Sequence, residues 1–114
     1  MINITIYNNI MHQCIGFDVE GHAGYAQRGN DVVCAAVSTL VINTINSIER
    51  LTSDKTSCTQ DEEKGIIEYR LESPISHEAD ILIRSMIFGL QDIQDDENYN
   101  SKFNSYIDIT YEEV

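Results

Sequence analysis

The chain has 114 residues, of which 19 are acidic and 7 are basic, so its formal net charge at pH 7 is −12. Hydrophobic residues make up 42% of it, as in ordinary globular domains and unlike disordered chains. The negative charge disfavours binding to nucleic acid or to anionic membranes, because their phosphate groups would be repelled. Basic proteins and peptides are the natural electrostatic partners of such a chain.

Three cysteines, Cys14, Cys34 and Cys58, cannot all pair within one chain, and none of them stands in a CxxC motif. Free thiols are typical of a reducing compartment. The N-terminus lacks the basic and then apolar layout of a signal peptide, and we expect no apolar run long enough to span a membrane. These features predict a cytoplasmic protein with no membrane partner.

Alternating apolar residues predict strands, and apolar residues at helical spacing predict helices. In chain order we expect strands at 2–7 and 14–19, a helix at about 32–51, strands at about 56–59 and 65–71, a second helix starting at Ser73-Pro74, and a last strand at 106–111. The order is therefore strand, strand, helix, strand, strand, helix, strand. It predicts an α+β fold in a single small domain over residues 1–114, with two helices packed on one mostly antiparallel sheet.

Cys34 is a candidate nucleophile because of where the first helix is expected to begin. Asp31 is a good N-cap residue for that helix. Cys34 then falls in the first helical turn, where unpaired N–H groups concentrate positive potential and favour the reactive thiolate. The alternative is that Cys34 is a small buried residue of the core, as free cysteines often are.

His22 is a candidate general base for this cysteine. It stands at the end of the second expected strand, where a flexible glycine-rich loop at about 21–31 begins. A strand end and a helix start joined by such a loop can bring an imidazole within reach of a thiol, as nucleophilic catalysis by cysteine requires. The alternative is a turn histidine that hydrogen-bonds to its own loop.

The string GHAGYAQRGNDVVCAAVS at residues 21–38 contains both chemical residues. It resembles the signature of the ribosomal-processing cysteine proteases, the Prp family of bacteria, with Val32 where isoleucine is commoner. Chain length and element order also fit, so the resemblance covers essentially the whole domain.

The resemblance implies a cysteine endopeptidase that removes the N-terminal extension of large ribosomal subunit protein twenty-seven. It implies α+β homodimers in which His22 and Cys34 form the catalytic pair and the segment between them is a mobile loop near the site. The bound substrate is then an extended peptide that is cut after an aromatic residue. We expect no cofactor and no metal.

Four further residues are candidates for supporting or substrate-binding roles. Asp31 either caps the helix or orients the histidine. Ser38, one helical turn after the cysteine, either hydrogen-bonds within the site or bonds to its own helix. Tyr25 is either a substrate contact or a loop anchor, and Gly21 gives the loop conformational freedom.

Two other functions fit parts of the sequence. A metal site could use His12, Cys14, His22 and Cys34, but no pair of these has the close spacing that zinc sites usually show. A non-enzymatic acidic dimeric module could bind a basic ribosomal protein and use the Cys34 region only as core. In both the enzyme and the binding module, we expect no direct contact with nucleic acid.

Overall fold

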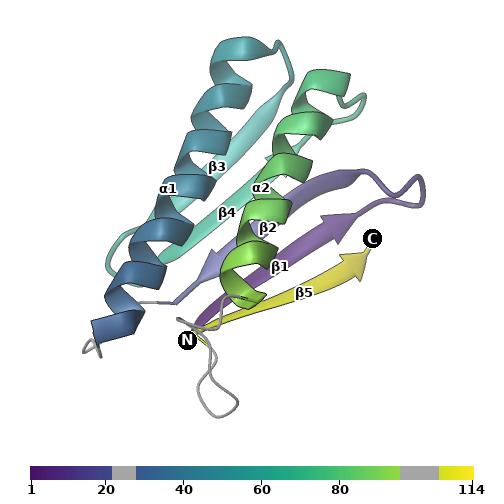
Figure 1. Ribbon diagram of the computed structural model, residues 1–114. Coiled ribbons are helices and arrows are strands. Elements are labelled where there is room, and N and C mark those ends of the chain that lie inside the picture. The colour runs from purple at the N-terminus through teal and green to yellow at the C-terminus, as the bar shows by residue number, and fades with distance from the viewer. Residues whose placement is uncertain (22–27, 96–105) are drawn as a thin grey trace.

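The computed structural model describes residues 1–21, 28–95 and 106–114, apart from the side chains of residues 28–31. Five strands and two helices lie in this described part (Figure 1). In chain order they are β1 (Ile2–Asn8), β2 (Cys14–Glu20), α1 (Arg28–Leu51), β3 (Thr56–Asp61), β4 (Ile66–Leu71), α2 (His77–Asp95) and β5 (Ile107–Glu113). The order of strands and helices predicted from the sequence is confirmed.

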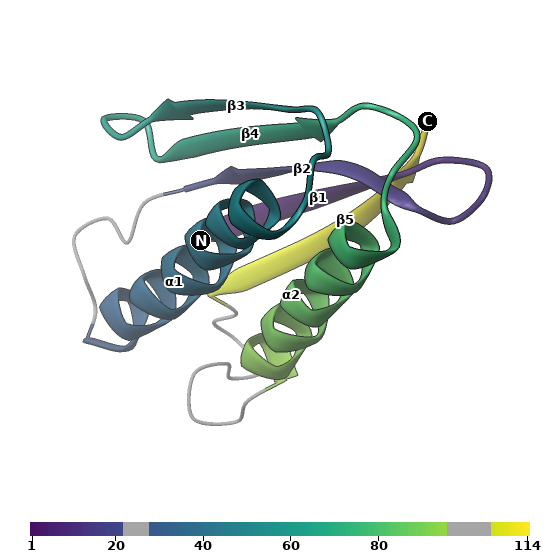
Figure 2. The same ribbon diagram turned by 90° about the horizontal axis from the view of Figure 1, so that it is seen from above.

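The strands form one sheet in the order β3-β4-β2-β1-β5. β1 pairs antiparallel with β2, β2 with β4, and β4 with β3, whereas β1 and β5 run parallel. Both helices lie on the same face of this sheet (Figure 2). The predicted α+β fold, with two helices on a mostly antiparallel sheet, is therefore confirmed.

Apolar and polar residues alternate along the strands, and this gives the sheet one apolar face. In β1, Ile2, Ile4 and Ile6 are each at most 1% exposed, and the polar residues between them point to the opposite face. Phe17 of β2 and Tyr69 of β4 pair across the neighbouring strands, and their ring centroids lie 5.2 Å apart. Each such buried side chain stabilises the fold by about 1.5–3 kcal/mol, so this face fixes the strand register.

The apolar character of α1 is explained by its place in the core. Its residues 32–51 have a mean hydropathy of 1.5, and they are long and apolar enough to cross a membrane by length and composition alone. The expectation that the chain has no such run is therefore wrong. One side of α1 packs against the sheet and α2 (Figure 2). The buried residues on this side are Val33, Val37, Val41, Ile45 and Ile48. This burial is the pattern of a core helix in a globular domain.

α1 begins earlier than its sequence suggests. It starts at Arg28, three residues before Asp31, so the Asp31 backbone lies inside the helix and does not form its N-cap. The predicted capping role of Asp31 is therefore wrong. The segment expected as a loop at about 21–31 is helical from Arg28 onward.

α2, in contrast, begins later than expected, at His77 and not at Ser73-Pro74. The backbone N–H of Ala79 donates a hydrogen bond to Ser76 Oγ at 3.0 Å, so Ser76 is the N-cap of this helix. Pro74 precedes the helix by three residues, in the connection from β4. It therefore lies outside the first helical turn, in which the sequence placed it.

Candidate active site

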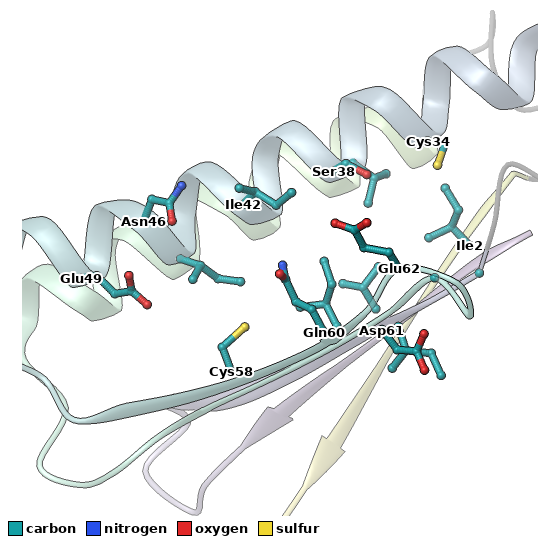
Figure 3. Close-up of a pocket in the computed structure, with 17 residues that line it drawn as sticks. Ile2, Cys34, Ser38, Ile42, Asn46, Glu49, Cys58, Gln60, Asp61 and Glu62 are labelled. Atoms are coloured by element: carbon teal, nitrogen blue, oxygen red, sulfur yellow. The ribbon is translucent and has the colours of Figure 1, made fainter.

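A groove of about 580 Å³ lies between α1 and the β3–β4 hairpin (Figure 3). Ile2 of β1, Val19 of β2 and Gly21, which follows β2, also line it. Its helical wall consists of Cys34, Val37, Ser38, Ile42, Ile45, Asn46 and Glu49, and its strand wall of Cys58, Gln60, Asp61, Glu62, Gly65, Ile66 and Ile67. Residues far apart in the chain therefore share one elongated surface.

Cys34 lies on the helical wall, toward one end of the groove (Figure 3). Its side chain is half-buried and packs against the hydrophobic core, so it has contacts with both the core and the groove. Because α1 begins at Arg28, Cys34 is in the second helical turn and not in the first turn as predicted. The dipole of a helix acts mainly within its first turn. The helix end alone therefore does not make Cys34 a nucleophile.

Ser38 lines the same groove one helical turn after Cys34, as its spacing predicted. Ile42, Asn46 and Glu49 continue this wall toward the other end of the groove (Figure 3). Sequence analysis missed these three residues. Their three- and four-residue spacing is visible in the sequence, but only the packing of α1 over the β3–β4 hairpin shows that this side of the helix faces a groove.

Gly21 also lines the groove, at the point where the chain leaves β2. Its φ of +133° lies in a region that only glycine adopts readily, and a Cβ atom there would collide with the carbonyl oxygen of Met1. Its N–H donates a 3.1 Å hydrogen bond to the Gly65 carbonyl. The role found for Gly21 is thus to hold a fixed backbone position at the groove.

His22 and Tyr25 lie outside the described residues, as does the side chain of Asp31. The roles predicted for His22 and Tyr25, and an orienting role of Asp31, stay predictions. The other two histidines are described, and neither lines the groove. His12 lies in the turn between β1 and β2 with φ 61°, and His77 is the first residue of α2.

The two remaining cysteines have distinct surroundings. Cys14 is buried, its Sγ donates to the Gly16 carbonyl at 3.2 Å, and burial raises its pKa to about 11. Cys58 lines the groove, although sequence analysis suggested no role for it. Burial and, to a lesser degree, the nearby carboxylate of Glu49 raise the pKa of Cys58. Both thiols are therefore protonated at neutral pH.

Among the described residues that line the groove, all the charged ones are acidic. Glu49, Asp61 and Glu62 contribute carboxylates, and no lysine or arginine lines it. The walls also include apolar residues such as Ile42 and Ile67. Such a surface suits a chain that carries apolar and basic side chains.

A half-buried thiol at one end of an elongated groove has the layout of a cysteine hydrolase that acts on an extended chain. A model of the family described as cysteine protease Prp matches residues 1–103. The ribosomal processing cysteine protease Prp of Staphylococcus aureus is 29% identical to this chain over 104 residues, which cover 91% of this chain and 98% of that protein.

Two crystal structures of the ribosomal processing protease Prp from S. aureus are also similar to this fold. One, in complex with a substrate peptide, has a TM-score of 0.86 and 27% identity. The other, with a covalently linked product peptide, has a TM-score of 0.83 and 28% identity. Each match covers 98% of this chain and 100% of the other.

The chain belongs to the cysteine protease Prp family, and it is a cysteine endopeptidase. The family and the enzyme class predicted from residues 21–38 are therefore confirmed. The non-enzymatic binding module considered as an alternative does not fit this family.

Proposed function

We propose that this endopeptidase removes the N-terminal extension of large ribosomal subunit protein twenty-seven, with Cys34 as nucleophile and His22 as general base. The observation that carries the assignment of Cys34 is its half-buried thiol on the wall of the groove. The relative from S. aureus is named a ribosomal processing protease, which supports a ribosomal protein as substrate. The acidic groove suits a basic ribosomal protein.

The cysteine content of the chain supports Cys34 by elimination. A cysteine protease needs one of its cysteines as nucleophile, and this chain has three. Cys14 is buried away from the groove and has a pKa of about 11. Cys58 lines the groove, but the pKa of its thiol is raised. Cys34 is the remaining thiol on this surface.

The histidines support His22 in the same way. The chain has three, and His12 and His77 both lie outside the groove lining. The β1–β2 turn and the start of α2, which carry them, are at the end of the molecule away from the first turns of α1 (Figure 1). His22 follows Gly21 directly in the sequence, and Gly21 lines the groove. Because the helix end alone does not activate Cys34, a general base is needed.

The proposed reaction proceeds in two halves. Cys34 Sγ attacks the carbonyl carbon of the scissile peptide bond while His22 takes the thiol proton. The C–N bond then breaks, His22 protonates the leaving amine, and the N-terminal part of the substrate stays on Cys34 as a thioester. Water attacks the thioester with His22 as its base, which releases the new carboxylate and restores the thiol.

The test uses a peptide that spans the processing site, with products identified by mass spectrometry. We expect one cut after an aromatic residue by the wild type, and none by Cys34→Ala, Cys34→Ser or His22→Ala. Cys58→Ala is the matched control in the same groove, and His12→Ala is the control for the base; both are expected to cleave. Cleavage by Cys34→Ala, or loss of cleavage in Cys58→Ala alone, contradicts the assignment.

We propose further that the enzyme acts as a cytoplasmic homodimer with no nucleic-acid or membrane partner. Three free cysteines support a reducing compartment, and the charge of −12 opposes contact with phosphates. Exposed Ile81 and Phe88 on α2 are candidates for burial between two copies. Light scattering at micromolar concentration should give twice the 12.9 kDa chain mass, and a monomer mass overturns the dimer.

A further inference from the structure

The groove extends far beyond Cys34. Cys34 and Glu49 line it at opposite ends of the same helical wall (Figure 3). They are separated by fifteen residues of α1, or about 22 Å at the helical rise of 1.5 Å per residue. An extended peptide advances about 3.3 Å per residue, so about six or seven of its residues reach from one side chain to the other.

The lining of the groove changes along this length. Its middle has apolar residues, Ile42 and Ile45 on the helix and Ile67 on β4, and the polar side chains of Gln60 and Glu62 lie on the facing wall (Figure 3). The end away from Cys34 is polar, with Asn46 and Glu49 on the helix opposite the strand residues of β3. A peptide that fills the groove therefore meets apolar surface near its middle and a carboxylate at the far end.

The carboxylate of Glu49 is available at that end. The ion pairs among the described residues join Asp18 to Arg70 and Asp80 to Arg84, and Glu49 takes part in neither. Its side chain is exposed on the groove wall, and its charge acts across the groove on the thiol of Cys58. No lysine or arginine among the described lining residues balances this charge.

Taking Cys34 as the nucleophile, as proposed above, we propose that Glu49 is a specificity-determining residue. It favours substrates with a lysine or arginine about six or seven residues from the scissile bond. The cationic side chain pairs with the Glu49 carboxylate while the peptide between Cys34 and Glu49 lies along the helical wall, past Ile42 (Figure 3). The pair lies at an open end of the groove, so its contribution is modest and decreases with salt.

A lysine scan of the peptide substrate tests this inference. In the peptide that spans the processing site, every lysine is replaced by glutamine. Single lysines are then placed at each position from two to nine residues on either side of the cut. With the wild type, a lysine about six or seven residues from the bond should raise kcat/KM about 2- to 5-fold over the neutral peptide on one side of the cut. The rise should be smaller in 0.5 M NaCl.

Variants of Glu49 assign the preference to its carboxylate. Glu49→Gln should abolish the rise that the lysine causes relative to the neutral peptide, and Glu49→Lys should favour a glutamate at the same peptide position. Glu113→Gln, at the end of β5 and outside the groove lining, is the matched control and should keep the wild-type preference.

The outcomes separate this inference from the proposed function. If the wild type cuts no peptide of the series, the proposed substrate fails. If it cuts them all but shows no preferred lysine position, or if Glu49→Gln keeps the preference, the role of Glu49 is overturned. A preference only for a lysine within three residues of the bond also overturns it, because it would point to a carboxylate nearer to Cys34 than Glu49, such as Glu62 (Figure 3).

Discussion

Gly21 and Gly65 are joined by a backbone hydrogen bond, from the Gly21 N–H to the Gly65 carbonyl at 3.1 Å. This bond ties the end of β2 to the turn between β3 and β4, and both glycines line the groove. The chain continues from Gly21 into His22. The geometry of the strand end therefore sets where the segment with the proposed base leaves the sheet.

Gly21→Ala should lower both stability and cleavage. The φ of +133° strains any residue with a side chain, and the added methyl group would collide with the Met1 carbonyl. We expect a loss of about 1–3 kcal/mol in the free energy of unfolding, measured by urea denaturation. Gly89→Ala is the comparison, because its methyl group would meet only the flexible end of Leu40. An equal or larger loss in Gly89→Ala would contradict this explanation.

Alkylation should label the three thiols in a fixed order. With iodoacetamide at pH 7, we expect Cys34 to react first, Cys58 more slowly and Cys14 slowest, as followed by peptide mass spectrometry. Cys14 is buried and its pKa is about 11. Cys58 is exposed, but partial desolvation of its thiol and the Glu49 carboxylate raise its pKa. Since the thiolate is the reactive form, the rate at Cys58 should rise about tenfold from pH 7 to pH 8. Equal rates at Cys34 and Cys58 at pH 7 would weaken the assignment of the nucleophile.

Asp18 should make stability depend on acid pH. Tyr7 Oη donates to one of its oxygens at 2.6 Å and Arg70 Nη1 to the other at 2.7 Å. Burial raises the pKa of Asp18, but these hydrogen bonds, with Arg70 first, outweigh burial and hold it below its usual value. The ionised form therefore stabilises the fold at neutral pH. This stabilisation is lost as the pH falls below about 4 and through the lowered pKa.

Asp18→Asn should then cost about 1 kcal/mol in the free energy of unfolding at pH 7 and less at pH 2.5. Urea denaturation at both pH values measures the difference. Asp108→Asn is the control, because its exposed side chain is on the same open face of the sheet. A cost for Asp18→Asn that is equal at both pH values would contradict the stabilising role of its charge.

Ile48→Ala tests the placement of α1 in the core. The Ile48 side chain is fully buried, so its truncation leaves a cavity and should cost about 2–5 kcal/mol in thermal or urea denaturation. Ile10→Ala is the matched change in the β1–β2 turn, where the side chain is 76% exposed, and should cost less than about 1 kcal/mol. Similar costs for the two variants would show that α1 is not packed as described.

Local patterns in the sequence predicted most of the fold. The alternation in β1 and the spacing of Val33, Val37 and Val41 in α1 each reflect one buried face, and this signal lies within a single element. The helix starts were less predictable. Asp31 and Pro74 are both residue types that favour a helix start, but α1 extends back to Arg28 and Ser76 caps α2.

The motif at residues 21–38 identified the family and the candidate pair, since both chemical residues lie in one short segment. The far end of the groove could not be predicted in this way. Glu49 and Cys58 face each other only because α1 packs over the β3–β4 hairpin, and neither residue carries a local signal of that contact. The substrate-binding surface depends on long-range packing, whereas the motif is local.

The most direct test of the central assignment is to locate the acyl-enzyme. The wild-type enzyme is mixed with the processing-site peptide and quenched in acid within the first turnovers. It is then digested, and the fragments are sequenced by tandem mass spectrometry. A thioester between the N-terminal product and Cys34 is the predicted result. A thioester on Cys58 or Cys14 would contradict the assignment of Cys34 as the nucleophile.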